Sequence, residues 1–199
     1  MSISTMKEIL RATEVFKTVV YSYDLKLDNR RLNKYCLDYA KNNEKSIISN
    51  VGGYQSKNLD LNHKYFKSIT EFINVILNEI SLNQFQFNQP VSITNMWFNI
   101  NKYKDYNREH QHTGSVLSGV FYLDVPKNCG NINFINPLEM NWYYNSDKVK
   151  NYNILNSSEY FFPVYKNVLY VFPSWLTHRV EPNLSKKDRI SFSFNSNFI

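Results

Sequence analysis

The sequence predicts an α+β fold in which an N-terminal helical layer packs on one sheet of a β-sandwich or β-barrel. Apolar residues recur mainly at helical spacing up to about residue 89. From residue 90 onward, short segments rich in β-branched and aromatic residues are separated by Pro, Gly and Asn. The chain has 199 residues, so we expect one domain over 1–199, with 1–89 mainly as helical support and 90–199 as the barrel core.

The N-terminal part is expected to contain two main helices. A short helix over residues 5–14 and a strand within 16–25 are expected before them. Asp28 is a candidate N-cap for the first main helix, and residues 50–56 have the composition of a turn-rich loop. The second main helix is expected over residues 62–82. Its predicted buried stripe comprises Phe66, Ile69, Phe72, Ile73, Ile76, Leu77 and Ile80.

The barrel core is expected to contain short strands whose pairing partners lie far apart in the sequence. Residues 138–166 are less regular, and we interpret them as an insertion near the mouth of the barrel. The expected strands are residues 91–100, 118–124, 131–135, 168–172 and 190–198.

The charge distribution argues against nucleic acid as a main partner. The net charge is +6, but the 23 Lys and Arg residues are spread along the chain without long runs. The N-terminus has no apolar signal region, and no segment is apolar over a membrane-spanning length. The two cysteines make neither a disulfide framework nor a zinc motif. We therefore expect a cytoplasmic protein with no membrane partner, and no feature of the sequence predicts its oligomeric state.

The spacing of three histidines predicts a metal site. His110 and His112 are two residues apart in a strand-like segment, so both rings are expected on one face. His178, from a distant strand, would complete a facial set of ligands with open positions, which suits non-haem Fe(II) oxygen chemistry. The alternative is that the three are hydrogen-bonded polar residues lining a pocket.

Arg189 follows the third histidine closely enough to bind a carboxylate cosubstrate. A 2-oxo acid chelates iron at one end, and its far carboxylate needs a cation, for which the guanidinium fork is suited. Ser191 lies on the same strand face as Arg189, and Tyr122 lies on an expected neighbouring strand, so both are candidate donors to the cosubstrate. The alternative for Arg189 is a surface ion pair with Asp188 or Glu181.

Several motifs, in a fixed order, resemble those of the Fe(II)/2-oxoglutarate-dependent dioxygenases of the prolyl-hydroxylase-like type. The narrower resemblance is to a group of 2-oxoglutarate-Fe(II) oxygenases found in bacteria and their viruses. Together the motifs run from about residue 49 to the C-terminus. They are SNVGGYQS at 49–56, MWFNI at 96–100, HQH at 110–112, LSGVFYL at 117–123, FPSWLTH at 172–178 and RIS at 189–191.

The resemblance implies a double-stranded β-helix of the jelly-roll or cupin-like kind. It implies that the protein hydroxylates a substrate with Fe(II) and 2-oxoglutarate, releasing succinate and carbon dioxide, with ascorbate as a possible reductant. His110 and His178 match the family's metal histidines, Arg189 matches the arginine that binds 2-oxoglutarate, and Tyr122 matches a tyrosine on the strand after the His-x-acid motif. The substrate, whether a small molecule or a protein side chain, is not implied.

Four more residues match motifs of the narrower group, to which we assign no family function: Asn50, Gln55, Trp97 and Asn99. Asn99 is expected to line the cosubstrate pocket if it faces the barrel interior, and Trp97 is expected in the core. His112 stands where most relatives have an acid. A site of three neutral imidazoles supplies no charge to the metal, so it should hold Ni, Cu and Zn well and be less selective for iron.

Two alternatives remain open at the level of sequence. A cupin-type enzyme would use the three histidines without a 2-oxo acid, and Pro173, five residues before His178, fits its second motif. Trp175 stands where a cupin has glycine, however, and no glutamate follows His112 before Tyr122. The other alternative is a barrel that has lost catalysis and acts as a binding module.

Overall fold

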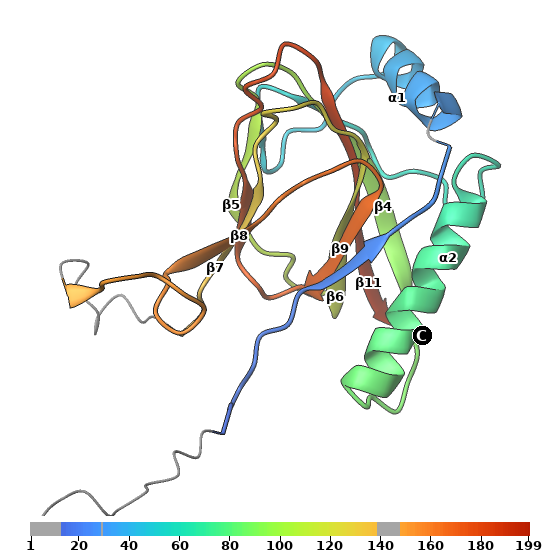
Figure 1. Ribbon diagram of the computed structural model, residues 1–199. Helices are drawn as coiled ribbons and strands as arrows, with labels where there is room; N and C mark the ends of the chain where they lie inside the picture. Colours follow the sequence, from blue (N-terminus) through green and yellow to red (C-terminus); the bar gives the residue numbers. More distant parts are fainter. Residues whose placement is uncertain (1–12, 29, 139–147) are drawn as a thin grey trace, which may run out of the picture.

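The structure is a computed structural model that describes residues 13–28, 30–138 and 148–199. Two antiparallel sheets face each other, and the helices cover the outside of the larger sheet (Figure 1). The elements are β1 (Tyr21–Asp24), α1 (Arg30–Asn42), β2 (Asn50–Val51), β3 (Tyr54–Gln55), α2 (Lys67–Asn78) continued by a π-helical segment (Glu79–Gln84), β4 (Val91–Asn101), β5 (Tyr106–His110), β6 (Leu117–Asp124), β7 (Ile132–Ile135), β8 (Glu159–Phe162), β9 (Val168–Pro173), β10 (His178–Val180) and β11 (Arg189–Phe198).

The order of the strands confirms the predicted fold class. The six-stranded sheet has the order β1-β9-β6-β11-β4-β3, and the five-stranded sheet has the order β2-β5-β10-β7-β8. Apart from the consecutive pairs β3–β4 and β7–β8, strands that are neighbours in a sheet are separated along the chain by strands of the other sheet. This is the double-stranded β-helix, with its helical layer on one sheet.

The alternation of side chains along β11 separates the hydrophobic core from the barrel interior. Ile190, Phe192 and Phe194 point outward into a cluster that includes buried residues of α2. Arg189 and Ser191 point inward and line the cavity between the sheets. Because successive side chains of a strand alternate between faces, the apolar set fixes the direction of the polar set.

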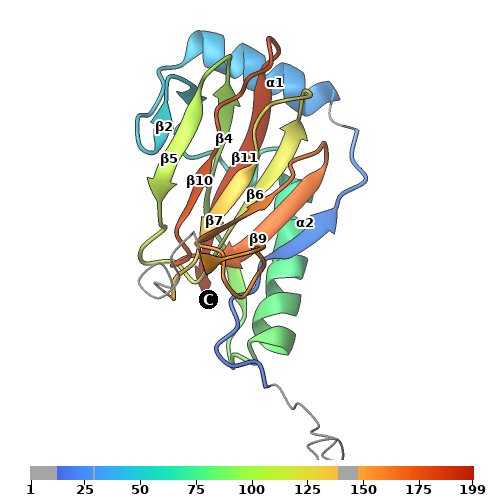
Figure 2. The ribbon, with the colours of Figure 1, turned by 60° about the vertical axis from the view of Figure 1, so that its left-hand side comes forward.

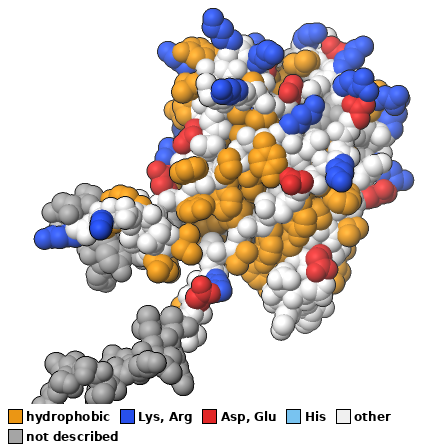
Figure 3. All heavy atoms as spheres, in the orientation of Figure 1, with side chains coloured by type: hydrophobic (Ala, Val, Ile, Leu, Met, Phe, Trp, Pro, Cys, Tyr) orange, Lys and Arg blue, Asp and Glu red, His pale blue; other side chains and the backbone are white. Residues whose placement is uncertain are grey.

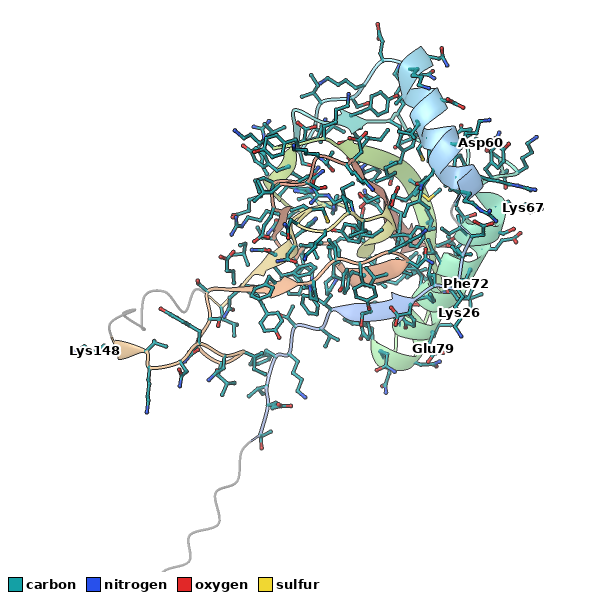
Figure 4. The ribbon with its side chains drawn as sticks, turned by 45° about the horizontal axis from the view of Figure 1, so that its top comes forward. Lys26, Asp60, Lys67, Phe72, Glu79 and Lys148 are labelled. Atoms are coloured by element: carbon teal, nitrogen blue, oxygen red, sulfur yellow. The ribbon has the colours of Figure 1, made fainter. Side chains whose placement is uncertain are left out.

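The helices agree with the sequence prediction, with two corrections. The first main helix is α1, and the carboxylate of Asp28 accepts a hydrogen bond of 3.2 Å from the backbone N–H of Arg30. The second is shorter than expected, since α2 begins at Lys67, and its end continues as the π-helical segment. Phe72, labelled on α2 in Figure 4, is 51% exposed and does not belong to the buried stripe.

Residues 50–56, expected as a loop, contain the short strands β2 and β3 in different sheets. The chain crosses between the sheets at Gly52 and Gly53. Gly52 has a φ of +81°, which favours glycine. A Cβ on Gly53 would lie 2.8 Å from the carbonyl oxygen of Ile100, so the close packing of this corner against β4 requires glycine.

The remaining strand predictions agree with the structure, except that three short strands were missed. The strand expected within 16–25 is β1. The strands β5, β8 and β10 are additional, and β8 lies inside the region interpreted as an insertion, where it pairs with β7 at a sheet edge. The helix expected at 5–14 lies almost entirely outside the described residues, as do 139–147 of that insertion.

Charged side chains of both signs are interspersed on the surface. On the face shown in Figure 3, Lys and Arg are spread over the upper part, with acidic side chains between them. In the part of the chain that the structure describes, no helix is long and apolar enough to cross a membrane. Cys36 and Cys129 are both buried free thiols.

We expect Phe192→Ala to lower the free energy of unfolding by about 3–5 kcal/mol, because it empties a site between α2 and the six-stranded sheet. Phe192 is 1% exposed and its ring lies 5.8 Å from that of Phe66. The matched control is Phe72→Ala, which should cost less than about 1 kcal/mol because the ring is half exposed. Urea unfolding of both variants measures the difference, and equal losses would contradict this packing.

Candidate metal centre and cosubstrate pocket

The three predicted histidines converge between β5 and β10, which lie side by side in Figure 2. His110 ends β5 and pairs directly with His178, the first residue of β10. His112 lies in the turn after β5, where its backbone N–H donates a 3.0 Å hydrogen bond to the carbonyl of Ser174. The sequence interpretation is therefore wrong in one respect: His110 and His112 do not lie on the same face of one strand, because β5 ends at His110 and the following turn brings the two rings together.

The geometry of the three rings suits a metal ion. Their ligand nitrogens all lie within 4.8 Å of one another. The centroid of the His110 ring is 4.3 Å from that of His178 and 5.0 Å from that of His112. Bonds of about 2.1 Å at right angles place neighbouring ligand nitrogens about 3 Å apart. Among the described residues, no carboxylate belongs to this group.

Hydrogen bonds to the backbone orient two of the three rings. The Nδ1 atom of His110 lies 2.7 Å from the carbonyl of Arg108, and Nδ1 of His178 lies 3.0 Å from the carbonyl of Leu176. A carbonyl only accepts, so Nδ1 carries the proton in both rings and Nε2 keeps its lone pair for a metal. Burial lowers the pKa of His178 to about 3 and that of His112 to about 4, so both rings are neutral at physiological pH.

Arg189 is buried inside the barrel with part of its guanidinium unpaired. Only 1% of its surface is exposed. Its Nη1 donates to the backbone carbonyls of Cys129 and Glu181, whereas Nε and Nη2 have no partner in the described part of the chain. The alternative of a surface ion pair with Asp188 or Glu181 is wrong, because Arg189 is buried and its hydrogen bond to Glu181 is with the backbone carbonyl, not with the carboxylate. Burial lowers the pKa of Arg189, but an arginine remains charged at neutral pH.

A row of polar side chains crosses the six-stranded sheet beside Arg189. In the strand register Ser191 is opposite Tyr122 on one side and Asn99 on the other. The hydroxyl of Tyr122 and the Oδ1 atom of Asn99 are buried without a partner among the described residues. Burial raises the pKa of Tyr122, so its hydroxyl remains protonated and can donate.

One narrow cavity contains all the predicted site residues: His110, His112, His178, Arg189, Ser191, Tyr122 and Asn99. Trp97 also lines this cavity and is half-buried, so its expected place in the core is wrong. Sequence reasoning missed Asn101 and Ser193, which line the cavity as well. The two-residue spacing of Asn101 from Asn99 and of Ser193 from Ser191 was the available signal.

These residues fit Fe(II) and a 2-oxo acid. Three neutral imidazoles are suitable first-row metal ligands and leave coordination positions open. The unpaired guanidinium nitrogens and the hydroxyl of Tyr122 are donors that a carboxylate would satisfy. Unpaired buried polar groups are rare in proteins, so a cavity lined by several unpaired donors fits an anionic ligand.

Comparison with known proteins supports the same conclusion. The sequence model of the family described as "Putative 2OG-Fe(II) oxygenase" matches residues 95–195, just over half of the chain. This stretch contains all seven predicted site residues. No curated protein matches the chain by sequence.

Solved structures with a similar fold share little sequence with this chain. A prolyl-4-hydroxylase of Pseudomonas putida has a TM-score of 0.64 at 15% identity, covering 90% of this chain and 93% of its own. The viral collagen prolyl hydroxylase of Paramecium Bursaria Chlorella virus-1 has a TM-score of 0.60 at 11% identity, covering 90% and 96%. HygX of Streptomyces hygroscopicus, whose structure contains nickel and 2-oxoglutarate, has a TM-score of 0.56 at 9% identity, covering 90% and 83%. By its family match and its fold, this chain belongs to the Fe(II)- and 2-oxoglutarate-dependent oxygenases.

Proposed function

We propose that the protein is a dioxygenase whose Fe(II) is held by His110, His112 and His178 and whose 2-oxoglutarate is held by Arg189. The observation that carries the proposal is the buried guanidinium with two unpaired nitrogens in the same cavity as the three rings. A cation buried in this way is costly unless a ligand pairs with it. A cupin-type enzyme without a 2-oxo acid, or a barrel used only for binding, would not need it.

The side chains around the cosubstrate have separate tasks. Arg189 binds the far carboxylate, and Ser191 and Tyr122 donate further hydrogen bonds to it. Asn99, in the same row, also lines the pocket. The backbone carbonyls of Arg108 and Leu176 keep the rings of His110 and His178 in the tautomer that binds metal. When bound, iron and 2-oxoglutarate supply the oxidative chemistry, which releases succinate and carbon dioxide and hydroxylates the substrate.

The proposed substrate is either a small molecule or a protein side chain. Ascorbate is proposed as the reductant that keeps the iron as Fe(II). We propose a cytoplasmic setting, supported by two buried cysteines that form no disulfide. The interspersed surface charge supports our expectation that nucleic acid is not a partner.

We expect anaerobic addition of Fe(II) and then 2-oxoglutarate to give a weak metal-to-ligand charge-transfer band in the visible spectrum. The band arises when the 2-oxo acid chelates the iron, so it tests metal and cosubstrate together. Iron binding without the band would instead support the cupin-type alternative. Failure to bind iron at all would support a barrel without catalysis.

Arg189→Gln is expected to raise the 2-oxoglutarate concentration for half-maximal band intensity by about 10- to 100-fold, because charge-assisted hydrogen bonds to the carboxylate are lost. The bound iron should be unchanged, since Arg189 does not belong to the group of possible metal ligands. The control is Arg30→Gln, at an exposed arginine on α1. Loss of iron in the Arg189 variant would show that the arginine is structural.

His112→Ala is expected to weaken Fe(II) binding at least about tenfold, because it removes one of three ligands. The control is His63→Ala, since His63 packs against Tyr35 and lies outside the metal group. Equilibrium dialysis of Fe(II) measures both variants. Equal affinity in the His112 variant and the wild type would exclude His112 as a ligand.

The set of three neutral histidines should also bind other metals during expression. We expect the purified protein to contain Ni or Zn and to turn over little 2-oxoglutarate. Stripping the metal and reloading with Fe(II) and ascorbate should restore succinate formation. If reloaded protein with bound iron remains inactive, the wrong metal does not explain the inactivity.

A further inference from the structure

In the motif at residues 49–56, the structure leaves the polar end of one buried side chain unexplained. The Nδ2 atom of Asn50 donates to the carbonyl of Gly53 at 3.0 Å and so fixes the corner between β2 and β3. The hydroxyl of Ser56 accepts a 3.0 Å hydrogen bond from the backbone N–H of Phe98. Gln55 is only 4% exposed, yet its Oε1 atom has no partner among the described residues. Its acceptor is therefore available to a ligand.

Gln55 extends the polar row of the cosubstrate pocket into a second hollow. In the strand register it is opposite Asn99, so the row runs from Tyr122 through Ser191 and Asn99 to Gln55. Gln55 lines an open groove that shares Trp97, His110 and His112 with the inner cavity. A molecule in this groove would therefore lie beside the proposed iron site.

The groove is open to solvent and rich in carboxamides. Its cavity volume is about 560 Å³, within the usual range of about 300–1,000 Å³ for ligand sites. Its charged lining residues are Lys57, Arg108 and Glu109, which leave a net charge of only one. The carboxamides that line it are Gln55, Asn58, Asn95, Gln111 and Asn195.

This chemistry selects a neutral, polar chain. A polyanion would need several cations along its path, and the groove has only Lys57 and Arg108, with Glu109 next to Arg108 in sequence. An apolar ligand would find only Ile48 and Trp97. A carboxamide has both donor and acceptor atoms, as does a peptide group, so a series of carboxamides can bind a main chain whatever its side chains are. An oligosaccharide would be expected to stack on several aromatic rings, and the groove has only Trp97 among its described lining residues.

We propose that this groove binds the substrate as an extended peptide segment, with Gln55 accepting a hydrogen bond from its main chain. The inference rests on the proposed function, because the bound segment is to be hydroxylated at the iron. Gln55 would then be a substrate-positioning residue, with no part in holding 2-oxoglutarate.

The test uses the full chain loaded with Fe(II) and 2-oxoglutarate. The probe is a positional-scanning library of decapeptides with acetylated and amidated ends, compared with a panel of neutral oligosaccharides. Succinate release above the level without probe, together with addition of one oxygen atom to the peptide, is the readout. The variants are Gln55→Leu, which keeps the size and removes the acceptor, and Gln84→Leu as an exposed control on the π-helical segment.

We expect peptide pools, and not oligosaccharides, to stimulate succinate release. With the best pool, Gln55→Leu should raise the KM for the peptide about tenfold. The 2-oxoglutarate concentration for half-maximal band intensity should change less than twofold. Gln84→Leu should change neither quantity. A normal band in the wild type without stimulation by any peptide would overturn this inference alone. Absence of the band in the wild type would overturn the proposed function, and this inference with it. A lost band in Gln55→Leu would place Gln55 in the cosubstrate pocket and refute its positioning role.

Discussion

The burial of Arg189 is the constraint on which the site depends. A guanidinium that is removed from water must be compensated, and among the described residues its hydrogen bonds go to the backbone carbonyls of Cys129 and Glu181. Arg189 points into the barrel because Ile190 and Phe192, on the other face of β11, are fixed in the core beside α2. A slip of one residue would place these apolar side chains in the cavity and the arginine against the helix. The helical layer therefore determines where the cationic pocket lies.

The charges around the cavity explain how a site without a carboxylate can function. The three imidazoles are neutral and Arg189 carries one positive charge, while no acidic side chain lines the cavity among the described residues. A divalent metal would raise the total to three positive charges in a region of low dielectric constant. Such a cavity attracts a dianion strongly, since the cosubstrate itself supplies the negative charge that an acidic ligand supplies in most relatives.

The sequence was sufficient to predict the long strands and seven residues that line one cavity, but not the way in which those residues meet. The strands β4, β6, β9 and β11 are rich in apolar residues and were predicted. The strand β5 has the sequence Tyr-Asn-Arg-Glu-His and β10 has only three residues, so neither gives a periodic signal. Their ladder pairing, which places His110 opposite His178, depends on contacts distant in sequence. Phe72 was wrongly predicted to be buried, because spacing alone does not separate the centre of an apolar helical stripe from its margin. Residues at the margin of the stripe face solvent.

The pairing of His110 with His178 has a mechanical consequence. The two residues belong to strands that are neighbours in the sheet but lie far apart along the chain, with β6, β7, β8 and β9 between them. An ion held by both would act as a crosslink across the short ladder of β5 and β10. Because the unfolded chain cannot present such a site, the binding free energy adds to the stability of the folded barrel. The metal ion would thus also stabilise the smaller sheet. Loss of the ion would weaken the pairing of β5 with β10 before that of other strands.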